Sequence, residues 1–194
     1  MGAYALASSM LEIFNRLVPY TISTVFLQKA VELKNISHQH LSERTYRLFL
    51  YMLLLSLFIF SGFALLGDIV FPWVFGNEWE TAGIFTTMLA FSYTFNFVAV
   101  ALTEVYKVSG RQKLLLSISI YMAIIKVISL VIIFFLQANV NTALFIYAVA
   151  SALGSAVLIV GVFYVLEYHI WKVLGLLFAA FGALLGIWLV GTMF

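Results

Sequence analysis

The sequence predicts an all-α protein, a polytopic transmembrane helix bundle that crosses a membrane about six times. Of its 194 residues, 64% are hydrophobic and only 9% are charged, whereas a soluble domain carries roughly 25% charged residues. The hydrophobic runs reach about 20 residues without alternation of polar and apolar positions, which excludes the dyad-patterned strands of a membrane barrel. We therefore treat residues 1–194 as one transmembrane domain.

Hydropathy sets the order of the six predicted spans along the chain. They cover Ala3–Leu27, Leu48–Leu66, Ala82–Tyr106, Leu114–Leu136, Ala143–Leu166 and Val173–Phe194. Each is a run long enough to cross the hydrocarbon core as a helix, and polar or charged residues separate it from the next run. Residues 31–47 and 67–81 form the two longest connections and are predicted as loops.

The basic residues predict the orientation. Eight of the ten Lys and Arg residues stand at alternate span ends, namely Lys29, Lys34, Arg44, Arg47, Lys107, Arg111, Lys113 and Lys172. Because Lys and Arg favour the cytoplasmic side, we predict residues 31–47 as a cytoplasmic loop and residues 67–81 as a periplasmic loop. The net charge of +2 is small and its bases are dispersed, so we expect no nucleic-acid partner.

The first span carries a polar stripe. Its residues recur at helical spacing and are Ser8, Glu12, Arg16, Pro19 and Ser23, with Asn15 beside them. An Arg at mid-span costs roughly 2.5–3.5 kcal/mol on insertion scales, so it normally faces a bundle interior or a water-filled cavity. Two interpretations stay open: the Glu12–Arg16 pair neutralises itself within the bundle, or the stripe lines a solvated path. Pro19 removes a backbone hydrogen bond, which predicts a helix kink.

Further polar groups lie in the third and fourth spans. Lys126 stands midway along the fourth span, too far from either interface to reach it, and we expect Glu12 or Glu104 as its partner. Glu104 could instead pair with Lys107 one turn on, and Asn96 could be an ordinary interhelical hydrogen-bonding residue. We predict the cavity residues Arg16, Lys126, Asn15 and Asn96, and the ion-coupling groups or charge partners Glu12 and Glu104.

Several chemistries find no support in the sequence. The chain has no cysteine, which excludes a disulfide framework, a thiol nucleophile and a cysteine metal site. His38 and His40 lie in the charged segment between the first two spans without a carboxylate at ligand spacing, so we expect no metal site. We also expect no cofactor and no enzymatic activity, because no carboxylate or histidine pair is placed for catalysis.

Three motifs occur in order along the chain: Gly2-Ala3-Tyr4 before the polar stripe, the string from Val74 to Gly83, and Ser109-Gly110-Arg111-Gln112-Lys113. Together they resemble bacterial polysaccharide and O-antigen flippases. The family belongs to the multidrug/oligosaccharidyl-lipid/polysaccharide exporter superfamily, and the likeness covers about residues 2–168. It implies that the six spans correspond to helices eight to thirteen of a transporter with twelve to fourteen helices in two lobes. Residues 139–143 depart from the Gly-x-x-Gly-Ala-Ala pattern that the family often has.

The resemblance implies a function. We expect part of a transporter that flips lipid-linked oligosaccharide precursors across the cytoplasmic (inner) membrane by alternating access, with Arg16 and Lys126 attracting the diphosphate or an acidic sugar. The implied partners are a polyprenyl diphosphate sugar, membrane lipids and an N-terminal lobe. The charge pattern places the N-terminus outside the cytoplasm, and nothing before Ala3 would hold it there, so we expect an additional upstream helix. A cation-coupled small-molecule or drug antiporter, a non-transporting membrane scaffold and a truncated remnant are the alternatives.

Overall fold

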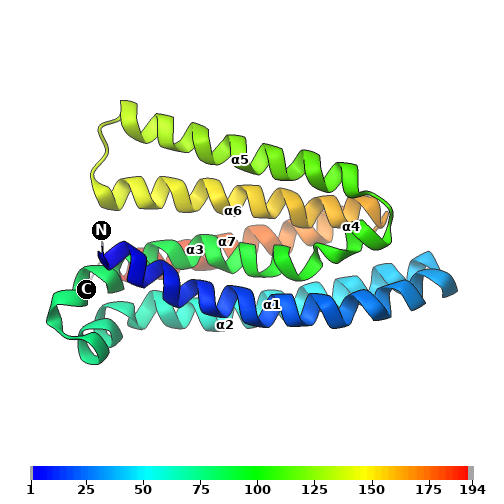
Figure 1. Cartoon of the computed structure of the whole chain (residues 1–194), viewed down its shortest axis with the longest axis horizontal. Coiled ribbons are helices and arrows are strands. Elements are labelled where there is room, and N and C mark those ends of the chain that lie inside the picture. The colour runs from blue at the N-terminus through cyan, green and yellow to red at the C-terminus, as the bar shows by residue number, and fades with distance from the viewer. Residues whose placement is uncertain (1, 192–194) are drawn as a thin grey trace.

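The computed structural model of the chain describes residues 2–191 and, within them, the side chains of all but residues 36 and 188–191. The described residues form helices and the turns between them, which confirms the predicted all-α class (Figure 1). The elements are α1 (Gly2–Ile36), α2 (His38–Phe75), the 3-10 helix η1 (Asn77–Trp79), α3 (Glu80–Leu102), α4 (Glu104–Val108), α5 (Gln112–Phe135), α6 (Val140–Val165) and α7 (Ile170–Gly191).

The long helices run along a common direction and form one bundle (Figure 1). α3 lies at its centre and packs against α1, α2 and α6, while α5 packs on the far side of α6. α7 packs against α2 and α6. This arrangement buries α3 more than any other of the apolar helices and leaves α5 on the outside.

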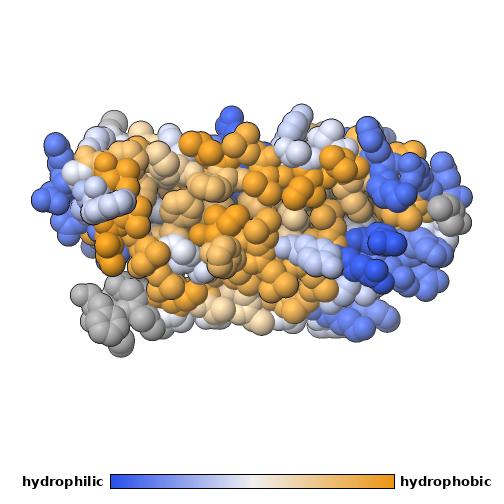
Figure 2. Space-filling view, turned by 90° about the horizontal axis from the view of Figure 1, so that it is seen from below, coloured by the Kyte–Doolittle hydropathy of each residue, from blue (hydrophilic) through white to orange (hydrophobic). Residues whose placement is uncertain are grey.

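Five helical segments within the described residues are long and apolar enough to cross a membrane. They are His38–Phe75, Asn77–Val108, Gln112–Phe135, Val140–Val165 and Ile170–Ile187. Figure 2 shows the corresponding wide hydrophobic band between hydrophilic residues that gather at the two ends. The protein is thus a multi-pass membrane protein by length and composition. α1 is long enough but carries the polar stripe, and its crossing stays a prediction.

The connection predicted over residues 31–47 is helical except at Ser37. Hydropathy detects only the apolar part of a helix, but a helix continues into water when its exposed side chains pair. Lys29 Nζ lies 2.8 Å from Glu32 Oε2 near the end of α1, and Gln39 donates to Glu43 at 3.1 Å at the start of α2. Ser37 caps α2 through its hydroxyl, which accepts from the backbone N–H of Gln39 at 3.2 Å.

Residues 67–81 are also mostly helical, contrary to the predicted loop. α2 continues through Pro72 to Phe75, and Gly76, with φ of +102°, then turns the chain. That conformation suits glycine, and the Gly76 N–H bonds the Pro72 carbonyl at 2.9 Å. Near this turn, α2 and α3 approach each other very closely, and Gly83 of α3 lies against the backbone of Gly67 of α2.

The turns α1–α2, α4–α5 and α6–α7 lie together at one end of the bundle (Figure 1), which we name the basic end because Lys34, Arg44, Arg111 and Lys172 lie in or beside these turns. The α2–α3 turn lies at the opposite end, with Asp68 and Glu78 beside or in it. The alternation of charge along the sequence therefore becomes an asymmetry between the two ends of the bundle.

Cysteine labelling tests the predicted orientation directly, because the chain contains no native cysteine. Asn77 and Gln39 are both exposed, at opposite ends of the bundle. In intact spheroplasts, an impermeant thiol reagent should label Asn77→Cys and not Gln39→Cys. The reason is that the positive-inside rule predicts a cytoplasmic placement for the basic end. Labelling of Gln39→Cys alone would show that the orientation is opposite to the predicted one. As a control, both variants should react after the membrane is permeabilised.

Candidate functional site

A polar cavity of about 390 Å³ lies between α1, α3, α5 and α6. Helices distant in the sequence line it, mostly with hydroxyl, amide and charged side chains: Tyr4, Ser8, Glu12 and Asn15 from α1, Leu89, Ser92, Tyr93 and Asn96 from α3, Lys126 from α5, and Tyr147 and Ser151 from α6. The structure thus brings the predicted cavity residues Asn15, Asn96 and Lys126 together with Glu12, whereas Arg16 does not line this cavity.

Helical spacing explains why these side chains converge. On α1, residues 4, 8, 12 and 15 are three or four positions apart and share one face, and on α3 residues 89, 92, 93 and 96 do the same. α1 and α3 pack directly against each other, so the two polar faces meet. α1 runs on through Pro19 as a single helix, and Pro19 itself does not line the cavity.

Two polar contacts join α1 to α3 at the cavity. Asn15 Nδ2 donates to Asn96 Oδ1 at 2.9 Å, which confirms the interhelical role considered for Asn96. Tyr93 donates its phenolic O–H to Glu12 Oε2 at 3.1 Å. The other Glu12 oxygen accepts from Arg16 Nε at 2.6 Å, so the predicted Glu12–Arg16 pair forms. Glu12 is therefore held by one group inside the cavity and one outside it.

Lys126 is the cation in this cavity, and in the described part of the chain it forms no ion pair. The partnership expected with Glu12 or Glu104 is thus absent there. Two further atoms, Asn15 Oδ1 and Ser151 Oγ, are buried without a hydrogen-bond partner, and both residues line the cavity. An ammonium without an ion pair at the wall of a polar cavity favours a polar ligand or water in this space, because an unpaired charged group at membrane depth is costly.

Arg16 lies beside the cavity, on the open side of α1, where 77% of its side chain is exposed. Two shallow hollows on this side are lined by Arg16 and Glu12, and one of them also by Asn15 and Asn96. Because Glu12 borders both hollows and the cavity, polar groups are continuous from Lys126 to Arg16. The interpretation that Glu12 and Arg16 pair within the bundle therefore fits Glu12, which borders the cavity, but not Arg16, which is largely exposed.

Glu104 lies away from the cavity. Its Oε1 is 2.7 Å from Lys107 Nζ, which is the local ion pair considered as the alternative from the sequence. Glu104 Oε2 is buried and has no partner. The short break at Thr103 separates α3 from α4 just before this residue.

Other cavity residues were not predicted as such from the sequence. They are Tyr4, Ser8, Leu89, Ser92, Tyr93, Tyr147 and Ser151. Tyr147 and Ser151 stand four positions apart in a mostly apolar span, and this pair of hydroxyls on one helix face was the available signal. Single hydroxyls in a span usually bond to their own backbone, as Ser92 does to the Leu89 carbonyl at 2.9 Å, so the signal is weak.

The arrangement can bind and enclose a polar group but offers few means for bond-making. No group of three or more His, Cys, Asp and Glu side chains placed to hold a metal occurs among the described residues. Comparisons with family models, with curated proteins and with solved structures find no match. The fold and the cavity together define the class: a multi-pass helical membrane protein with a polar cavity between its helices that is lined by one lysine and one glutamate.

The Asn15–Asn96 hydrogen bond should contribute measurably to the packing of α1 on α3. A double-mutant cycle with Asn15→Ala and Asn96→Ala should give a coupling free energy of about 0.6 kcal/mol and at most about 1.7 kcal/mol, the range for interhelical hydrogen bonds in membranes. Reversible unfolding in detergent measures it. The control pair Asn15→Ala and Ser117→Ala should show no coupling free energy. If the effects of Asn15→Ala and Asn96→Ala were also additive, the hydrogen bond between these two residues would not stabilise the bundle.

Proposed function

We propose that the chain is part of a transporter that flips lipid-linked oligosaccharide or polysaccharide precursors across the cytoplasmic membrane by alternating access. The observation that carries the proposal is the cavity with an unpaired lysine at its wall. The resemblance of three sequence motifs to polysaccharide flippases supplies the substrate class.

The Lys126 ammonium supports an anionic headgroup, because the other charged residue of the cavity, Glu12, is already paired with Arg16. Lys126 lies near the middle of the mostly apolar helix α5, and at membrane depth Coulomb attraction is more weakly screened than in water. A diphosphate offers several acceptor oxygens to this ammonium, and the hydroxyl groups of a sugar can pair with the hydroxyl and amide side chains that line the cavity. The polyprenyl tail would stay in the bilayer beside the bundle while the polar head crosses through the cavity.

The exposure of Arg16 supports an opposing wall. Glu12 and Arg16 lie well within α1, far from both of its ends, and Arg16 is largely uncovered. An exposed charged pair at membrane depth is costly against lipid and is normally met by protein or by water in a cavity. A second lobe facing this side of α1 would enclose the polar path, and rocking of two lobes would open it to each side in turn.

This transport requires no covalent step, so the chain needs no catalytic residues and we propose no enzymatic activity. Movement of the headgroup needs a polar route and two alternating openings. Glu12, bonded to Tyr93 on one side and Arg16 on the other, is the group through which cation coupling would act.

Substitution of Arg16 tests the proposal. In the natural chromosomal context, Arg16→Ala should lower surface glycan by 10- to 100-fold, because a hydrogen bond to a charged group contributes about 1.5–3 kcal/mol. Arg16→Lys keeps the charge and should lose less. Glycan on gels is the readout, membrane insertion is checked in parallel, and Arg111→Ala at the basic end is the control. Normal glycan in Arg16→Ala with lost drug resistance would instead support the antiporter.

A further inference from the structure

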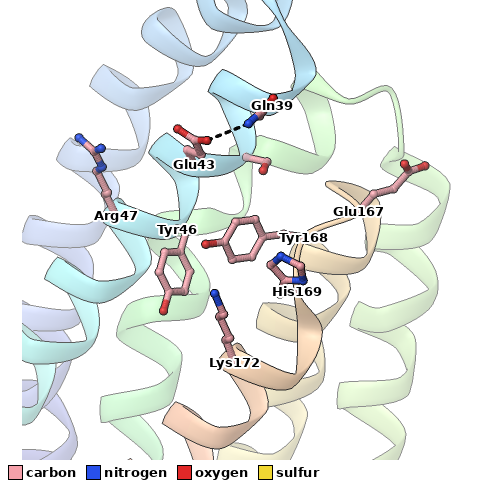
Figure 3. A pocket seen from close by; sticks show the side chains of 9 residues that line it. Gln39, Glu43, Tyr46, Arg47, Glu167, Tyr168, His169 and Lys172 are labelled. Carbon is pink, nitrogen blue, oxygen red and sulfur yellow. Dashed lines mark hydrogen bonds between the residues drawn. The ribbon is translucent and has the colours of Figure 1, made fainter.

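A second pocket, of about 480 Å³, opens at the basic end (Figure 3). One wall is the first part of α2, where Glu43, Tyr46 and Arg47 share a helix face. The other wall is the turn between α6 and α7 with the start of α7, from which Tyr168 of the turn and Lys172 of α7 point toward α2 (Figure 3). None of these residues belongs to the central cavity, so the proposed transport route leaves this pocket without a role.

Stacked aromatic rings form a rigid floor. Tyr46 and Tyr168 stack with ring centroids 4.8 Å apart, and Phe163 packs edge-on to Tyr46 at 6.1 Å. Phe163 and Phe49 behind them are fully buried. The turn is fixed by Glu167, which adopts a φ of +51°, and by the bond from the Tyr168 N–H to the Phe163 carbonyl at 3.0 Å. The pocket is therefore preformed on the hydrophobic core.

The pocket presents charges of both signs. Arg47 and Lys172 are cationic and Glu43 and Glu167 are anionic, yet among the described residues none of the four forms an ion pair. Glu43 only accepts a hydrogen bond from Gln39, at 3.1 Å. Figure 3 shows the Lys172 amino group directed at the two tyrosine rings, with His169 beside it. Separated, unpaired charges of both signs favour a ligand that itself carries both.

The position of the pocket indicates where such a ligand comes from. Trp171 and Tyr164 flank the turn and are exposed to 85% and 67%, and these residue types favour the headgroup level of a membrane. Burial, and after it the neighbouring Tyr46 and Glu43, raise the pKa of the Tyr168 phenol. The phenol therefore stays protonated at neutral pH and can donate to a phosphate oxygen.

We propose that this pocket binds the headgroup of a phospholipid that carries both a phosphate and a primary ammonium, of the phosphatidylethanolamine type. Lys172, His169 and the Tyr168 phenol contact the phosphate, and Arg47 lies at the rim. The ammonium donates to Glu43, because the Lys172 amino group already points at the tyrosine rings. A purely anionic headgroup would meet the Glu43 carboxylate, and a quaternary ammonium has no N–H to donate to it.

Native mass spectrometry of the full chain in detergent tests the site. The probes are phosphatidylethanolamine, phosphatidylcholine and phosphatidylglycerol with identical acyl chains, offered in competition. The wild type should retain the ethanolamine lipid about tenfold over either of the others, which corresponds to one hydrogen bond to a charged group. Lys172→Ala should lose about tenfold of this retention, whereas Lys113→Ala, exposed at the same end but outside the pocket, should lose none.

Glu43→Gln tests the second charge separately. It should reduce retention of the ethanolamine lipid and increase that of phosphatidylglycerol, because the repelling carboxylate is gone, while Glu32→Gln on α1 should change neither. Both positions are exposed, so folding is unaffected, and size-exclusion chromatography checks it. Equal retention of the three lipids, or equal loss in Lys172→Ala and Lys113→Ala, would overturn the proposal. Displacement by an equal concentration of soluble phosphoethanolamine would overturn the lipid assignment. These outcomes do not depend on transport.

Discussion

Replacing Lys126 by methionine should nearly abolish glycan export, with the protein still inserted in the membrane. Methionine keeps the length of the side chain and removes the charge, so it lowers the cost of insertion while it deprives the cavity of its cation. We expect a loss of at least about 100-fold, larger than for Arg16→Ala, because the Lys126 ammonium borders the central cavity and has no ion pair among the described residues. Surface glycan and the accumulated lipid-linked precursor are measured together.

Two controls distinguish the effect of losing the Lys126 charge from the effect of any substitution in α5. Lys126→Arg retains the cation and should retain part of the export, although its planar fork will not place the charge at the same point. Lys113→Met removes an exposed lysine from the first turn of the same helix and should leave export unchanged. If Lys126→Met exported glycan normally, the cavity would not be the route, and the scaffold interpretation would gain support.

Replacing Gly83 by alanine should destabilise the bundle more than any comparable substitution in the cavity. A Cβ atom at Gly83 would overlap the carbonyl oxygen of Gly67, which is backbone of the neighbouring helix and cannot rotate away. α2 and α3 would have to move apart, and overpacking of this kind costs about 1–3 kcal/mol. Close approach of helices at small residues also contributes much of the packing energy in membranes. Thermal unfolding in detergent should show a lowered midpoint.

Gly62→Ala is the matched control, since it lies in α2 and a Cβ atom there meets nothing within 4 Å. In an open helical position alanine is favoured over glycine by roughly 0.5–1 kcal/mol, so this variant should be equal to the wild type or slightly more stable. The two substitutions change the sequence in the same way and should differ in sign. A Gly83→Ala variant as stable as Gly62→Ala would contradict the close α2–α3 crossing.

Hydropathy predicted the positions of the apolar helices but not where the helices begin and end. The predicted second span, Leu48–Leu66, lies wholly within α2, which extends from His38 to Phe75. Hydropathy reports the apolar centre of a helix and is blind to polar turns beyond it, since these are stabilised by local pairs and caps. The break at Ser37 and the turn at Gly76 follow from capping and from a positive φ, which are local chemistry rather than composition.

The candidate site shows the complementary limit. Glu12, Asn15, Asn96 and Lys126 were identified from the sequence because they are polar residues within apolar spans. Such residues are costly in a membrane and usually have a functional or packing role. The sequence could not decide which of them meet. Glu104 is also a charged residue within an apolar span, yet it pairs with Lys107 at 2.7 Å outside the cavity. Tyr147 is neither charged nor an amide and was not selected, yet it lines the cavity.

The sequence by itself determined the class of this protein: helices, long and apolar enough to cross a membrane repeatedly, with basic residues at alternate ends. These properties depend on composition and on spacing along one chain, and both can be read directly. Only the tertiary structure decided that α3 lies at the centre, that its polar face meets that of α1, and that Lys126 remains unpaired beside them. The reason is physical: the partner of a helix face depends on how side chains of different helices interlock, and no spacing within one helix encodes that choice.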